Sequence, residues 1–137
     1  MIKLGDWTTL SDDAKLVRFE VFVQEQNVPA ELEMDSLDAL CLHAVAYGAD
    51  GVPVGTARLL PDGHIGRMAV RKPGRGSGIG GALLQALMEQ AKARGDKVVM
   101  LSAQTHAAPF YERHGFRIEG DEFFEAGIAH IHMHYAF

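Results

Sequence analysis

The chain has 137 residues, 47% of them hydrophobic and 23% charged, and this length and balance predict one globular domain over residues 1–137 with its own core. Thirteen Lys and Arg against 18 Asp and Glu give a net charge of −5, which argues against a nucleic-acid-binding protein, although residues 67–75 form a local basic patch. Cys41 is the single cysteine and excludes an intrachain disulfide, no apolar run approaches a membrane span, and the N-terminus does not resemble a signal peptide, so we expect a cytoplasmic protein without a membrane partner.

The first predicted element is a helix that starts at Ser11, where a capping hydroxyl precedes two acids, and runs to about Val23. Its residues Leu16, Phe19 and Val23 share one face. Residues 24–38 are polar, contain a proline and predict a loop with one or two short helical turns. Glycine-containing turns then separate three predicted strands, over residues 40–47, 54–60 and 65–70.

The second half of the chain contains the clearest predicted helix, over residues 79–94. Gly95 ends it, and its apolar residues recur at helical spacing: Ile79, Leu83, Leu87 and Ala91. The apolar run "VVML" indicates a strand over residues 98–102 that is buried on both faces. A short helix over residues 107–114 precedes two closing strands, over residues 116–119 and 130–137. This order of elements predicts an α+β fold in which helices pack on a mixed sheet.

The segment "VRKPGRGSGIGGALL" joins the third strand to this helix, and its glycines are Gly74, Gly76, Gly78, Gly80 and Gly81. Amides in a glycine-rich turn and at a helix N-terminus attract anions, so the segment predicts a cradle for phosphate or pyrophosphate, to which Arg75 adds a cation. A Walker A loop would need Lys-Ser/Thr after the glycines, and Ala82 follows instead. Two other interpretations stay open: a dinucleotide loop, which would need its first glycine nearer to the strand, and a tight turn without a ligand.

Three motifs in the right order resemble the GNAT acetyltransferase superfamily: "MAV" at residues 68–70, "RGSGIG" at residues 75–80 and "PFYERHGF" at residues 109–116. More narrowly, "RFEVFVQEQNVPAELEMDSLD", "IGRMAV", "AQTHAAPFYERHGF" and "FFEAGIAHIHM" are similar to its ElaA/YjcF-like branch, from about Arg18 to Met133. The resemblance implies the GNAT acyl-CoA N-acyltransferase fold. That fold is a twisted, mixed, mostly antiparallel sheet of six to seven strands, flanked by about four helices and splayed between the strands at 65–70 and 98–102.

The resemblance also implies an acetyl-CoA-dependent N-acetyltransferase, which moves the acetyl group directly to an amine of a small molecule or a peptide. Homodimers are common in the superfamily. Alternatives are a non-catalytic acyl-CoA sensor or interaction module with this fold, and an enzyme for longer acyl chains. Gln104 stands where many members carry Asn. The residues that would bind coenzyme A are Met68, Ala69, Val70, Arg75, Gly76, Ser77, Gly78, Ile79, Gly80, Gly81, Gln104, Phe110 and Tyr111.

Two proton transfers in this reaction need side chains, because the amine must lose a proton and the departing thiolate must gain one. Tyr111 matches the tyrosine that acts as the acid in the family. Glu33 and His106 are the leading bases, since Glu33 lies in the branch-specific segment and His106 lies just before the Tyr111 helix. The other acids and histidines that could take this role are Glu25, Glu31, Asp35, His43 and His130.

The run "HIHMH" places His130, His132 and His134 on one face of a strand. Three adjacent imidazoles on a strand do not make a compact tetrahedral set, so we expect an exposed strand face and no metal. Cys41 lies in an apolar stretch and is expected in the core. Trp7 is expected to pack the N-terminal segment.

Overall fold

The computed structural model describes residues 1–30 and 35–137. Seven strands and three α-helices follow one another along these residues, joined by short π-helical and 3₁₀ segments. In chain order the elements are β1 (Ile2–Gly5), α1 (Trp7–Arg18), the π-helical η1 (Phe19–Glu25), η2 (Ser36–Leu40), β2 (Leu42–Tyr47), β3 (Pro53–Leu59), β4 (Ile65–Val70), η3 (Lys72–Gly74), α3 (Ile79–Ala93), β5 (Val98–Gln104), η4 (Thr105–Ala107), α4 (Ala108–Arg113), β6 (Arg117–Glu125) and β7 (Ile128–Ala136).

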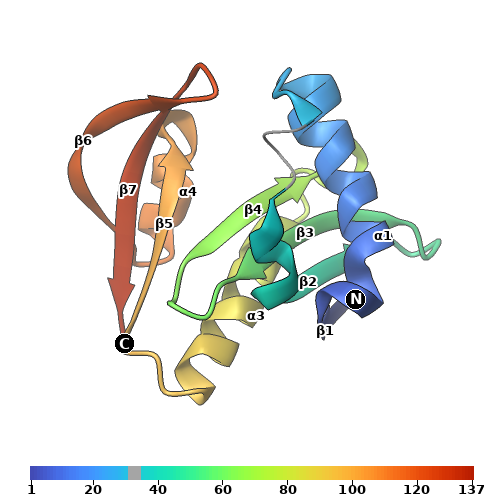
Figure 1. The fold of residues 1–137 in the computed structure, drawn as a ribbon, viewed down its shortest axis with the longest axis horizontal. Coiled ribbons are helices and arrows are strands. Elements are labelled where there is room, and N and C mark those ends of the chain that lie inside the picture. Colours follow the sequence, from blue (N-terminus) through green and yellow to red (C-terminus); the bar gives the residue numbers. More distant parts are fainter. Residues whose placement is uncertain (31–34) are drawn as a thin grey trace.

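The strands form two antiparallel sheets, in the orders β1-β2-β3-β4 and β5-β7-β6 (Figure 1). The sheets meet where His64 and Met100 form an isolated parallel bridge and the Met100 amide donates to the Gly63 carbonyl at 3.1 Å. A Cβ at position 63 would lie 2.8 Å from the Val98 carbonyl oxygen, so this approach requires glycine. Beyond the bridge, β4 and β5 diverge. The expected splayed, mostly antiparallel fold of six to seven strands is therefore confirmed, although the seven described strands form two sheets and three α-helices are described where about four were expected.

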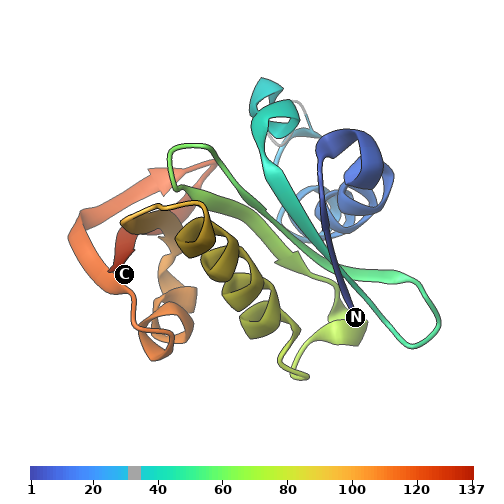
Figure 2. The same ribbon diagram turned by 90° about the horizontal axis from the view of Figure 1, so that it is seen from below.

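Helices α1 and α3 cover opposite faces of the first sheet (Figure 2). Side chains of α3 pack closely on β3 at Gly55, where an added Cβ would lie 2.9 Å from Leu83 Cδ1 and 3.0 Å from Ile79 Cγ2. None of the described helices is long and apolar enough to cross a membrane. The predicted helix and its apolar face are confirmed, because the buried residues of α3 are Leu83, Leu84, Leu87, Met88 and Ala91.

The first helix differs from its prediction at both ends. It begins at Trp7 because Asp6 caps it, with Asp6 Oδ1 accepting from the Thr9 amide at 2.9 Å, so the predicted start at Ser11 is wrong. It also continues past Val23 as η1. The buried face contains Leu10, Ala14, Val17 and Val21, whereas Leu16 and Phe19, predicted to face inward, are about half exposed.

Two features of the C-terminal half also differ. The run "VVML" is not buried on both faces, because Val99 and Leu101 are buried while Val98 and Met100 are only partly so. The strand predicted over residues 116–119 continues to Glu125, since Gly120 is accommodated within β6 next to a register shift. A turn at Ala126 and Gly127, both with positive φ, then leads into β7.

The predicted packing roles of Cys41 and Trp7 are confirmed. Cys41 is buried, its Sγ lies 3.2 Å from the Leu37 carbonyl oxygen, and burial raises the pKa of its thiol. The Trp7 ring packs on the His43 ring with 4.7 Å between centroids, which joins α1 to β2.

A buried network of ion pairs lies beside α1. Asp38 on η2 accepts from Arg18 Nη1 at 2.9 Å and from Arg58 Nη1 at 2.8 Å, and both Asp38 and Arg18 are only 1% exposed. Asp35 accepts from Arg58 and also from Arg67 Nη2 at 3.1 Å. The network therefore ties η2 to α1, β3 and β4.

Acid should destabilise the protein through Asp35. Hydrogen bonds from Arg58 are the largest cause that lowers the pKa of this carboxyl from 3.8 to about 2. The folded-state pKa is the lower one, so the stabilisation is present above pH 4 and is lost as the pH falls toward 2. The shift corresponds to about 2 kcal/mol. We expect Asp35→Asn to lower the free energy of unfolding by about this amount at pH 6, and the difference from wild type to shrink by pH 2.5, in urea titrations. A constant difference over this range would contradict the assignment.

Candidate active site

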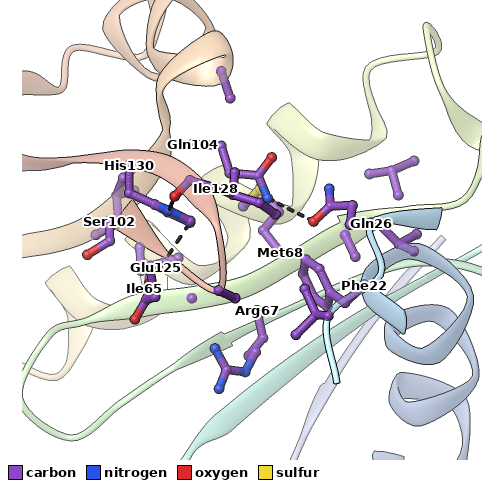
Figure 3. A pocket seen from close by; sticks show the side chains of 18 of the residues that line it. Phe22, Gln26, Ile65, Arg67, Met68, Ser102, Gln104, Glu125, Ile128 and His130 are labelled. Atoms are coloured by element: carbon purple, nitrogen blue, oxygen red, sulfur yellow. Dashed lines mark hydrogen bonds and ion pairs between the residues drawn. The ribbon is translucent and has the colours of Figure 1, made fainter. Parts of the chain in front are cut away.

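A cleft of about 770 Å³ lies where the two sheets part (Figure 3). Strand β4 forms one wall, and the end of β5 with the following η4 and α4 forms the other. The segment η1 and the turn between β6 and β7 close its ends. The cleft thus brings together segments that are far apart in the sequence. The lining residues used below are Glu25, Gln26, His64, Arg67, Met68, Ala69, Val70, Arg75, Gln104, His106, Tyr111, Glu125, Ile128 and His130.

The β4 wall offers backbone groups to a ligand. β4 is the last strand of its sheet, so its outer edge faces the cleft and not another ladder. The pairing with β3 also shifts register, from Thr56 opposite Ala69 to Arg58 opposite Gly66, and Arg67 in this bulge has a φ of 48°. An extended ligand could therefore add to β4 as a further strand.

The glycine loop leaves room at the N-terminus of α3. Gly76 and Gly78 have φ of 79° and 81°, and a Cβ on either would meet no atom within 4 Å. Gly78 is the N-cap residue of α3 and supplies no side chain, while the Ala82 amide makes the first intrahelical bond to the Gly78 carbonyl. The first amides of α3 thus have no intrahelical partner and lie at the positive end of a 15-residue helix, as an anion cradle requires.

The first turn of α3 packs against α4 and its end at two further glycines. A Cβ on Gly80 would make an ordinary contact at 3.6 Å with the Phe110 ring, whereas one on Gly81 would lie only 3.2 Å from the His114 ring, so this packing favours glycine at position 81. Ser77 does not offer its hydroxyl hydrogen to a ligand here, because Ser77 Oγ donates to the Gly74 carbonyl at 2.6 Å.

Arg75 connects the glycine loop to β4 and to η1. Its Nε donates to the Val70 carbonyl at 2.8 Å, and its Nη2 donates to Glu25 Oε1 at 2.7 Å. The cation that the sequence predicts for the cradle is therefore paired with Glu25 in this structure. The bond from Nε also means that a ligand amide that binds the Val70 carbonyl shares that oxygen with Arg75.

Tyr111 and Met68 face each other across the cleft. The Tyr111 hydroxyl donates to Met68 Sδ at 3.7 Å. Its ring is held edge to face by Phe110 and Phe116, with centroids 5.0 and 6.0 Å away. Burial raises the pKa of Tyr111 to about 12, so the phenol is protonated at neutral pH and can act as a proton donor.

Comparison with known proteins identifies the family of this chain. Residues 9–137 match the family model described as an acetyltransferase (GNAT) domain. The chain belongs to the GNAT acetyltransferase family. Over 125 residues it is 45% identical to the uncharacterized N-acetyltransferase YjcF of Bacillus subtilis, covering 88% of this chain and 89% of that protein.

Two solved structures with similar sequences share the whole GNAT fold. An acyl-CoA N-acyltransferase from Pseudomonas aeruginosa is 30% identical with a TM-score of 0.87, covering 99% of both chains. Escherichia coli ElaA is 30% identical with a TM-score of 0.83, covering 98% of this chain and 99% of that one. The chain is thus an N-acetyltransferase of the ElaA/YjcF-like branch.

Two of the predicted bases, Glu31 and Glu33, lie outside the described residues. Three others do not fit the proton-accepting role in this cleft. Glu25 is held by Arg75, and this hydrogen bond lowers the pKa of Glu25, which makes it a weaker base. Asp35, with its pKa of about 2, belongs to the ion-pair network. His43 does not line the cleft: its Nε2 lies 2.8 Å from the Asp38 carbonyl oxygen, and burial lowers its pKa.

Two predicted histidines do line the cleft. His106 is exposed on η4. His130 lies on β7, opposite Gln104 of β5. Sequence reasoning missed Glu125 and His64, which also line it. The Ala-Gly pair at 126 and 127 could have predicted the position of Glu125, because this pair forms a tight hairpin turn between β6 and β7. Glu125 directly precedes that turn.

Gln104, expected to contact coenzyme A or substrate, contacts the protein. Its Nε2 donates to Gln26 Oε1 at 2.9 Å, so the end of β5 is joined to η1 across the cleft (Figure 3).

The histidines of β7 have separate partners. His132 is exposed, with its Nδ1 3.1 Å from Ser102 Oγ, and His134 Nδ1 lies 3.2 Å from Glu119 Oε2. Within residues 1–30 and 35–137, no group of three or more His, Cys, Asp or Glu side chains could hold a metal ion. The expected exposed strand face describes His132 but is wrong for His130, whose side chain is only 12% exposed.

Proposed function

We propose that the protein catalyses direct transfer of an acetyl group from acetyl-CoA to an amine. The observation that carries this proposal is the contact between the Tyr111 hydroxyl and Met68. Met68 lies on the open edge strand β4, which leads into the glycine cradle. A donor that spans the cradle and the edge of β4 would bring its thioester to this hydroxyl. The acyl-CoA N-acyltransferase name of the Pseudomonas relative supports an acyl-CoA donor.

Different residues would bind the donor, stabilise the developing charge and transfer protons. The amides at the N-terminus of α3 would bind the pyrophosphate, and the backbone of Met68 and Val70 would bind the pantetheine amides. Backbone amides near the β4 bulge would donate to the acetyl oxygen as negative charge develops there. Tyr111 would give its proton to the departing thiolate and recover one from water. The amine must lose a proton to a second group.

The proposed function is tested with a panel of polyamines, amino sugars, amino acids and lysine peptides. We expect free thiol and acetylated product with at least one amine and acetyl-CoA. Calorimetry with coenzyme A runs in parallel. Binding without thiol release from any amine would contradict the enzyme and would favour the non-catalytic sensor. Faster release from succinyl-CoA or a longer acyl-CoA would replace acetyl as the transferred group.

The cradle is tested by a matched pair of glycine substitutions. Gly78 and Gly51 have the same φ of 81°, and a Cβ on either meets no atom within 4 Å. Leucine at either position costs about 1–3 kcal/mol of backbone strain. Only Gly78 lies in the loop, since Gly51 lies in the turn between β2 and β3. We expect Gly78→Leu to weaken coenzyme A binding at least tenfold in calorimetry, and Gly51→Leu to change it less than twofold. Equal affinities of the two variants would contradict a cradle at Gly78.

A further inference from the structure

The end of the cleft beneath the β6–β7 turn holds a histidine in a defined tautomer. His130 Nδ1 lies 2.7 Å from the Ile128 carbonyl oxygen. A carbonyl oxygen only accepts hydrogen bonds, so the neutral imidazole carries its proton on Nδ1. His130 Nε2 is then left with its lone pair. The backbone of the turn thus prepares one nitrogen of this ring to accept a proton.

Two neighbours define the surroundings of the His130 ring. Glu125 Oε2 lies 3.9 Å from Nε2, so a carboxylate stands beside the nitrogen that carries the lone pair. Phe123 stacks on the ring at 5.9 Å between centroids and 26° between planes, which fixes its orientation. The His130 side chain lines the cleft and is 12% exposed (Figure 3).

Other ionisable groups surround the same space. His132, on the same face of β7, also stacks on Phe123, at 4.5 Å between centroids, but does not line the cleft. From the remaining walls, the cleft is lined by His64, Arg67, Tyr111, His106 and Glu25. Arg67 is paired with Asp35 and Glu25 with Arg75, so both carry charges that are largely balanced.

We propose that His130 Nε2 takes the proton of the acceptor amine, directly or through one water, and that Ile128 and Glu125 position and stabilise the resulting imidazolium. This inference rests on the proposed function. The amine N–H bond breaks as the new C–N bond forms, the proton moves to Nε2, and His130 returns it to solvent after the product leaves. The thiolate is protonated separately by Tyr111. The acceptor amine is therefore presented beneath the β6–β7 turn.

The test compares His130→Gln with His132→Gln, using acetyl-CoA and the most active amine of the panel. Glutamine keeps a polar side chain but cannot accept a proton at neutral pH. General-base catalysis contributes about 10²–10⁴-fold, so we expect kcat to fall at least 100-fold in His130→Gln, with coenzyme A affinity within twofold of wild type. The acid limb of the pH profile of kcat/KM should disappear with it. His132→Gln, on the same strand face, should retain both.

Two further measurements separate this role from a loss of folding. Imidazole added to His130→Ala should restore part of the rate, which a merely structural defect would not allow. His106→Gln should retain the acid limb. An active wild-type enzyme whose acid limb persists in His130→Gln, or disappears in His106→Gln, would overturn the inference and leave the proposed function intact. A wild-type protein that releases no thiol with any amine would remove both.

Discussion

Replacing Asp38 with asparagine should lower the free energy of unfolding by about 3–5 kcal/mol, because it leaves two buried guanidinium groups without their shared carboxylate. Arg18 and Arg58 both donate to Asp38 Oδ1, at 2.9 and 2.8 Å, and Arg18 donates to Oδ2 as well, at 3.1 Å. Hydrogen bonds and charge from Arg18 and Arg58 outweigh burial and lower the pKa of Asp38, so the carboxylate is charged at neutral pH. Urea unfolding at pH 7 measures the loss.

The control for this prediction is Asp12→Asn. Asp12 is an exposed acid on α1, and the same loss of charge there should change stability by less than about 0.5 kcal/mol. If Asp38→Asn unfolds with a loss no larger than that of the control, the network does not hold η2 against α1 and β3. Arginine-to-lysine changes at position 58 would then be expected to be neutral too.

The second large effect is expected from Tyr111→Phe, which should lower kcat about 10²–10⁴-fold, the usual contribution of a general acid. The phenyl ring keeps its contacts with Phe110 and Phe116, and the hydroxyl loses only a weak contact to the Met68 sulfur. Coenzyme A affinity should therefore stay within twofold. Stopped thiol-release assays at saturating acetyl-CoA and amine measure the effect on kcat.

Tyr135→Phe is the matched control for Tyr111→Phe. The Tyr135 ring packs on Phe116 and Phe137 and does not line the cleft, so removal of its hydroxyl should leave kcat unchanged. A Tyr111→Phe enzyme with wild-type turnover would remove this hydroxyl from the mechanism. The thiolate would then leave unprotonated or receive its proton from water.

Local patterns were sufficient to predict the central elements. The strand over residues 65–70 and the helix that starts at Ile79 were placed correctly, since apolar periodicity and flanking glycines act over a few residues. Two features depend on tertiary contacts and could not be predicted in this way. Strand β1 is short and largely exposed, and it exists because it pairs with β2. Arg18 and Asp38 are buried, although charged residues usually lie at the protein surface.

The parts of the candidate site that lie in short sequence motifs could be predicted. The parts that depend on contacts between distant segments could not. The glycine loop and Tyr111 follow from motifs. Arg67 in a left-handed conformation gives no sequence signal, because arginine rarely adopts it. The meeting of Glu125 and His130 depends on a hairpin whose two positive-φ residues set the register of β6 and β7. The branch-specific segment and the position just before the Tyr111 helix therefore favoured Glu33 and His106 over His130.

The divergence of β4 and β5 has a further consequence for the free protein. It turns two strands in the middle of the molecule into sheet edges, and unpaired edges are the places where foreign strands add and aggregation begins. The glycine at position 63 holds the two edges together at one end, and a donor that binds as an added strand would cover the edge of β4 beyond it. A bound donor would then also block the addition of a second strand at this edge.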